Sequence, residues 1–98
     1  MNQIYQYSNP QVVYEKAKKY LGDDVILSLS DKPKKKYMVY NPNTNKWVYF
    51  GQMGFSDFTK HQDEKRRYNY LRRTENMRGN WRDNVYSPNN LSRNILWN

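Results

Sequence analysis

The chain contains no cysteine and no long apolar run. The absence of cysteine excludes disulfide frameworks, thiolate zinc sites and cysteine nucleophiles. No apolar stretch approaches the ~18 residues that a membrane span requires. The residues after Met1 also lack the charged-then-apolar order of a secretory signal. We therefore expect an intracellular protein without a membrane span.

Hydrophobic residues are also scarce, at 37% of a 98-residue chain. A chain of this length has room for one small core, and a cofactor enzyme with its own substrate domain would hardly fit. We expect a binding protein with no catalytic residue, no cofactor and no small-molecule substrate. Its oligomeric state stays open.

Acidic residues are also few. The 17 Lys and Arg residues outnumber 9 Asp and Glu residues, which gives a net charge of +8. Such an excess favours an acidic partner: nucleic acid, an anionic membrane or an acidic protein surface. Lys, Asn and Tyr all have A/T-rich codons, so genomic bias explains part of their abundance. The placement of the charges is therefore more informative than their number.

Local patterns in the first half predict one helix followed by strands. Pro10 follows Ser8 and Asn9, either of which can cap a helix, and apolar positions recur at helical spacing from there to Leu21, before Gly22. Short runs rich in β-branched and aromatic residues then predict a small three-stranded antiparallel meander, over 25–29, 36–40 and 46–50. A Pro/Asn-rich turn joins the last two strands into a hairpin.

The second half predicts two further helices, and the whole is an α+β fold with two to three helices on the sheet. One helix covers about 62–77, and a short one follows Ser87 and Pro88 and runs to Trp97. We expect an N-terminal tail over 1–9 and one small domain over 10–98, composed of a helix–strand extension (10–33) and a core (34–97).

The helix at 62–77 carries the clearest functional signal. Residues seven apart lie nearly in line on a helix. Four cations with this spacing predict one basic stripe: Lys65, Arg66, Arg72 and Arg73. Tyr68 and Leu71 point elsewhere and are expected to face the core, while Arg78 and Arg82 extend the positive surface beyond the helix. The alternative is a solvated face held by ion pairs, but nearby acids are too few to pair these cations.

A second basic cluster enters the predicted hairpin and comprises Lys32, Lys34, Lys35 and Lys36. These lysines could follow a nucleic-acid backbone or could only protect an edge strand from pairing with other chains. Both interpretations stay open.

Aromatic residues of the hairpin raise the question of base stacking: Tyr37, Tyr40, Trp47, Tyr49 and Phe50. Exposed aromatics on a sheet stack on unpaired bases, but a small domain needs large side chains in its core, and we favour core packing. Because Tyr37 and Val39 alternate with Met38 and Tyr40, both faces are partly apolar and one is left for a partner. Trp81 and Trp97 are expected to anchor a loop and the chain end.

His61 is the single histidine and lies near Asp57, Asp63 and Glu64 in the sequence. A metal site or a general base could be drawn from these residues. Capping at a helix start explains Asp63 and Glu64 without such a site. We therefore expect no metal site and no enzyme.

Much of the chain resembles a known family. The resemblance rests on four stretches in order: KKYMVYNP, KWVYFGQMGFSDFTKH, DEKRRYNYLRR and YSPNNLSRNILW. The span 34–97 resembles small basic proteins of unknown function encoded by large nucleocytoplasmic DNA viruses. The resemblance implies a viral source and a location in the virion, the infected host cytoplasm or a viral factory. It implies no catalytic residue.

Two functions therefore compete. The first is a DNA-binding virion component that contacts phosphates through its Arg/Lys-rich helix and through Lys34, Lys35 and Lys36. The alternative is a minor capsid or cement protein, a structural protein that bridges acidic surfaces of larger viral coat proteins. An inhibitor of a host nucleic-acid-binding enzyme has no positive support.

Overall fold

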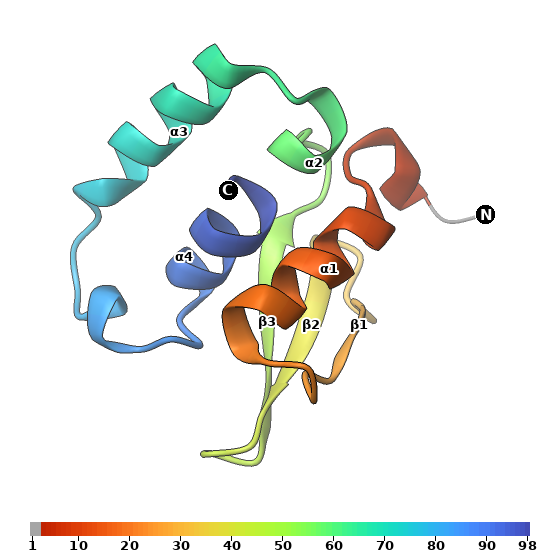
Figure 1. The fold of residues 1–98 in the computed structure, drawn as a ribbon, viewed down its shortest axis with the longest axis vertical. Helices are drawn as coiled ribbons and strands as arrows, with labels where there is room; N and C mark the ends of the chain where they lie inside the picture. Colours follow the sequence, from red (N-terminus) through yellow and green to blue (C-terminus); the bar gives the residue numbers. More distant parts are fainter. Residues whose placement is uncertain (1–2) are drawn as a thin grey trace.

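The computed structural model describes residues 3–98, in which one antiparallel sheet is covered by helices on one face (Figure 1). Strands β1 (Leu27–Leu29), β2 (Lys35–Asn41) and β3 (Lys46–Gln52) lie in the order β1-β2-β3. Both pairings are antiparallel. The predicted α+β fold with a three-stranded meander is confirmed.

Helix α1 (Pro10–Leu21) begins and ends where the sequence predicted. The Asn9 side chain caps its first turn by accepting a hydrogen bond from the Val12 amide, and Pro10 occupies the first position, where no N–H is needed. Gly22 ends the helix with φ of 110°, a backbone region that side chains disfavour.

The remaining helices are short apart from α3. They are α2 (Phe58–His61), α3 (Glu64–Glu75), α4 (Pro88–Leu91) and the π-helical turn η3 (Ser92–Leu96), with 3₁₀ turns η1 (Gln3–Gln6) and η2 (Trp81–Asp83). The predicted helix over 62–77 is found as α3, shortened by two residues at each end. The separate turn α2 lies before the predicted range and is capped by Gln62, which adopts a left-handed conformation. Within residues 3–98, four α-helices accompany the sheet, and two of them, α2 and α4, are single turns, in agreement with the predicted small α+β fold.

The core lies between the sheet and the elements α1 and η3. Tyr37, Val39 and Phe50 of the sheet are almost completely buried against apolar residues of the helices, which include Val13, Ala17, Leu91, Ile95 and Leu96. Tyr37 and Phe50 are cross-strand partners, and their rings stack 5.7 Å apart. Core packing is therefore confirmed for these two aromatics.

The N-terminal segment differs from its prediction as a tail. Residues 3–9 pack onto the body of the protein, since Ile4 and Ser8 are buried. The Ser8 hydroxyl accepts a hydrogen bond from Tyr37 and is bonded to Thr59, 51 residues away. The prediction as a tail missed these contacts, because the partners of Ser8 lie far along the chain. Residues 1 and 2 of the predicted tail lie outside the described residues.

The other face of the sheet is the more exposed one among the described residues. Met38, Tyr40, Trp47 and Tyr49 alternate with the core residues and are partly or well exposed, with Trp47 at 42%. Tyr40 and Trp47 meet edge to face at 5.6 Å. The hairpin aromatics are thus divided between the core and this more exposed face, and a partner on this face stays a prediction.

Candidate nucleic-acid interface

Helix α3 stands apart from the sheet, with the C-terminal helical segment between them (Figure 1). Its start is fixed by Asp63, whose side chain accepts hydrogen bonds from the amides of Lys65 and Arg66. This confirms Asp63 as a capping acid. The first turn also contains Glu64, and the last contains Arg72 and Arg73, an order that the helix dipole favours.

Polar and aromatic contacts hold α3 to the chain end. Tyr70 stacks on Trp97 with ring centroids 4.2 Å apart and planes 10° from parallel. The Arg67 side chain donates a hydrogen bond to the backbone oxygen of Trp97 at 2.9 Å, and Arg93 donates to the Leu71 carbonyl and the Thr74 hydroxyl. Trp97 therefore anchors the chain end, as predicted.

The assignment of core-facing residues on α3 was wrong for Tyr68, which is 60% exposed, whereas Leu71 is half-buried. Thr74 is the buried residue of the helix. The periodicity of a helix with so few apolar residues does not define its inner face, because the contacts that hold it are a ring stack and hydrogen bonds from arginines.

All four predicted cations of α3 are exposed, and they divide between two sides of the helix. Arg66 and Arg73 line a cleft, together with Asn69 and Tyr70 at the same helical spacing, whereas Lys65 and Arg72 lie outside that lining. The Arg73 guanidinium also lies 5.4 Å from the Tyr70 ring centroid. One stripe was predicted, and two adjacent rows are found.

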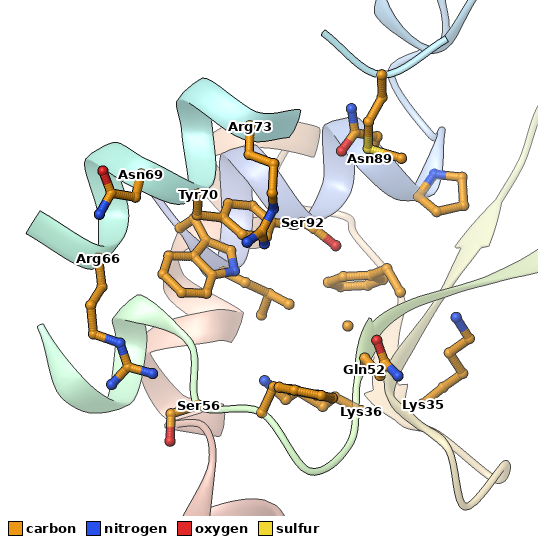
Figure 2. Close-up of a pocket in the computed structure, with 17 residues that line it drawn as sticks. Lys35, Lys36, Gln52, Ser56, Arg66, Asn69, Tyr70, Arg73, Asn89 and Ser92 are labelled. Carbon is orange, nitrogen blue, oxygen red and sulfur yellow. The ribbon is translucent and has the colours of Figure 1, made fainter. Parts of the chain in front are cut away.

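The cleft lies between α3, the C-terminal helical segment and the ends of β2 and β3 (Figure 2), and has a volume of about 620 Å³. In Figure 2, Arg66 and Arg73 reach down from α3 toward the hollow, while Lys35, Lys36 and Gln52 lie on the sheet side. The fold thus brings lysines of the hairpin and arginines of α3, some 30 residues apart in the sequence, to one hollow.

The predicted lysine cluster is divided by the fold. Lys34 and Lys35 are exposed, but Lys36 is 3% exposed and its ammonium lies 3.0 Å from the Asp57 carboxylate. Burial lowers the pKa of Lys36, and the charge of Asp57 opposes that change. The prediction of Lys36 as a binding residue needs correction, because its charge is already neutralised in the interior.

Asp57 is the centre of a buried polar network. Its carboxylate also accepts hydrogen bonds from the amide and hydroxyl of Thr59, and Thr59 contacts Ser8, which accepts from Tyr37. Burial raises the pKa of the Tyr37 hydroxyl well above its usual value. This network joins the N-terminal segment, β2 and α2, and it occupies both oxygens of the Asp57 carboxylate.

His61 accepts a hydrogen bond at Nδ1 from the Asp63 amide, while its buried Nε2 has no partner among the described residues. Burial lowers its pKa. Residues 3–98 contain no group of three or more His, Asp or Glu side chains able to hold a metal ion. The arrangement around His61 is local capping at the turn between α2 and α3.

The two cations beyond α3 have different surroundings. Arg78 is exposed on the following loop. Arg82 donates a hydrogen bond to the Glu75 carbonyl and lies 4.3 Å from the Trp81 ring centroid. The Trp81 indole donates to the Met77 carbonyl at 2.8 Å, so Trp81 anchors this loop, as predicted.

Sequence reasoning did not identify the aromatic and amide residues of the cleft, which include Asn69, Tyr70, Gln52 and Trp97. A signal was present in part: Arg66, Asn69, Tyr70 and Arg73 follow the spacing i, i+3, i+4, i+7 of one helix face. Nothing in the sequence showed which elements lie opposite that face.

No helix within the described part of the chain is long and apolar enough to cross a bilayer. A comparison with curated proteins gave no match, and neither did a comparison with solved structures. A family of unknown function, DUF5754, matches residues 25–74, about half of the chain. This range begins before the first strand and ends in the last turn of α3, so it includes the hairpin and the arginine pair of the cleft. The chain therefore belongs to the DUF5754 family of unknown function.

Proposed function

We propose that this protein is a non-enzymatic basic protein that binds nucleic acid through its phosphates. One observation carries the proposal: within the described residues, eight of the nine predicted binding cations form no ion pair. The described residues contain three ion pairs, and these involve Lys18, Lys36 and Arg67. The other predicted binding cations belong to none of them: Lys34, Lys35, Lys65, Arg66, Arg72, Arg73, Arg78 and Arg82.

Unpaired arginines near one another repel, and an anionic partner relieves this repulsion when it binds. Arginine presents a planar fork of donors that matches two phosphate oxygens. Exposed lysines at the start of β2 add to the same positive region, because Lys35 shares the cleft with Arg66 and Arg73. These features favour contacts with a phosphate backbone over readout of base sequence.

The nucleic acid that we propose is DNA, and the place of action is the virion or the infected cell. This part rests on the resemblance of residues 34–97 to proteins of large DNA viruses. A structural role as a minor capsid or cement protein is the alternative, with acidic coat-protein surfaces as the partner. The same unpaired cations would serve it, so binding experiments must separate the two.

The test is binding of the purified protein to labelled double- and single-stranded DNA at low and moderate salt. We expect micromolar or tighter binding that weakens steeply with salt. An R66A/R72A/R73A variant should lose most of the affinity, because it removes three exposed cations that belong to no ion pair within the described residues. Absence of binding at moderate salt would contradict the proposal and direct attention to acidic coat proteins.

A further inference from the structure

The cleft between α3 and the sheet differs chemically from the exposed outer row of α3. It is a hollow of about 620 Å³, within the range of pockets that hold small organic ligands. Its lining contains no Asp or Glu residue. Three exposed cations contribute to it from two elements: Lys35, Arg66 and Arg73. An anionic group would therefore find several donors and no opposing carboxylate.

The apolar part of the lining is largely aromatic. Trp97 and Tyr70 form a stacked pair along one wall, and Phe55 is 63% exposed on the loop after β3. Such an exposed ring is costly in water and offers a flat surface for a planar group. Phosphate alone would use the cations but not these rings.

Amide side chains complete the lining. Asn69 projects from α3, and Gln52 ends β3 on the opposite side (Figure 2). Both side chains are exposed and form no hydrogen bond within the described residues. An amide offers one acceptor and two donors, which matches the mixed edge of a nucleobase.

We propose that this cleft binds a nucleotide unit, with the base against Phe55 and the Trp97–Tyr70 pair and the phosphate at Arg66, Arg73 and Lys35. The unit is either an unstacked nucleotide of a single strand or a free nucleotide. A base inside a duplex is stacked and cannot enter such a hollow. The inference rests on the proposed function and adds to it a preference for unpaired nucleotides.

The chain offers a matched pair of variants for the test. R73A removes a cation of the cleft, and R72A removes the same charge from the adjacent residue outside it. Affinity for labelled oligothymidylate and for a hairpin duplex with the same number of phosphates is measured for both. We expect the wild-type protein to prefer the single strand by about tenfold, the effect of stacking one base. R73A and F55A should lose this preference, and R72A should weaken both ligands equally.

Thymidine monophosphate distinguishes the two sources of the nucleotide. Displacement of oligothymidylate by the mononucleotide, together with a change in tryptophan fluorescence that R73A abolishes, assigns the cleft to free nucleotides as well. A single-strand preference without such displacement assigns it to nucleotides within a strand. Either result supports the cleft as the site.

Three results would overturn the inference. Equal affinity for both oligonucleotides, together with equal losses of affinity in R72A and R73A, would support phosphate binding. It would reject the cleft as a nucleotide-binding site. A preference that survives R73A and F55A but disappears in W47A would place stacking on the more exposed face of the sheet. Absence of binding to oligonucleotides would reject the proposed function, and the cleft proposal would then fail unless the mononucleotide still binds.

Discussion

The core beneath the sheet and helix α3 are held in place by different kinds of contact. Val39 and Ile95 have no exposed surface, whereas Thr74 is the buried residue of α3. Burial of apolar surface stabilises the core, at roughly 25 cal/mol per Å². A ring stack, caps and arginine hydrogen bonds hold α3. The two regions therefore have different roles. The apolar core stabilises the fold, and helix α3 carries exposed cations that form no ion pair.

The same contrast exists between two basic groups. Lys36 is buried and paired with Asp57, while Arg66 and Arg73 are exposed beside the cleft without an acid. A buried pair contributes to the fold only while both partners are present. Exposed cations contribute little to stability and remain available to a partner. Each prediction below tests one side of this division.

The largest expected effect is the loss of Asp57. D57A leaves the Lys36 ammonium buried without a counter-charge, so we expect a loss of about 3–5 kcal/mol in the free energy of unfolding. Urea denaturation followed by circular dichroism measures it. The double variant K36M/D57A removes the orphaned charge and should recover part of the stability. If the free energy of unfolding of D57A lay within about 1 kcal/mol of the wild-type value, the Lys36–Asp57 pair would be hydrated and not part of the core.

The next comparison sets the core directly against α3. I95A should cost about 2–5 kcal/mol, because it removes a fully buried side chain next to the sheet. Y68A on α3 should stay within about 0.5 kcal/mol of the wild type, as exposed positions do. Thermal and urea unfolding of both variants provide the numbers. Similar losses for the two would mean that α3 is part of the core, and the proposed division would be wrong.

The smallest predicted effect on stability concerns pH and the network around Tyr37. Burial raises the pKa of this hydroxyl, so the unfolded chain loses the proton at lower pH than the folded one. The resulting stabilisation is fully present below about pH 10, the ordinary tyrosine pKa, and is lost as the pH rises above it. The difference in unfolding free energy between the wild type and Y37F should therefore shift against the wild type above pH 10. A difference independent of pH would show that Tyr37 ionises equally in both states.

Sequence reasoning predicted the elements whose signals are local. Helix α1 has its cap and its proline at the first turn and its glycine directly after the last residue. The meander has aromatic strands around a Pro/Asn turn. The burial of Lys36 could not be predicted in the same way, because the carboxylate that pairs with its ammonium belongs to Asp57, 21 residues further along the chain. The inner face of α3 is set by the stacking of Tyr70 on Trp97, 27 positions later in the chain. The helix pattern alone therefore predicted a core-facing Tyr68, which is exposed.

Sequence reasoning predicted the cations of the candidate site but did not predict the cleft that they line. Arg66 and Arg73 were identified from their spacing, and the structure adds that they face Lys35 across a hollow. Convergence of two distant segments is a property of tertiary packing, and single-sequence patterns report only neighbours along one element.

The central claim is that the unpaired arginines of α3 bind phosphates. The most direct measurement is the dependence of DNA affinity on salt for the wild type and for R66A/R72A/R73A. Each phosphate contact contributes about 0.9 to the slope of log K against log salt for duplex DNA and about 0.7 for single strands. We predict that the triple variant folds normally and that its slope falls by about 2–3, the equivalent of three lost contacts. An unchanged slope would contradict the claim, because the arginines would then not meet the phosphates.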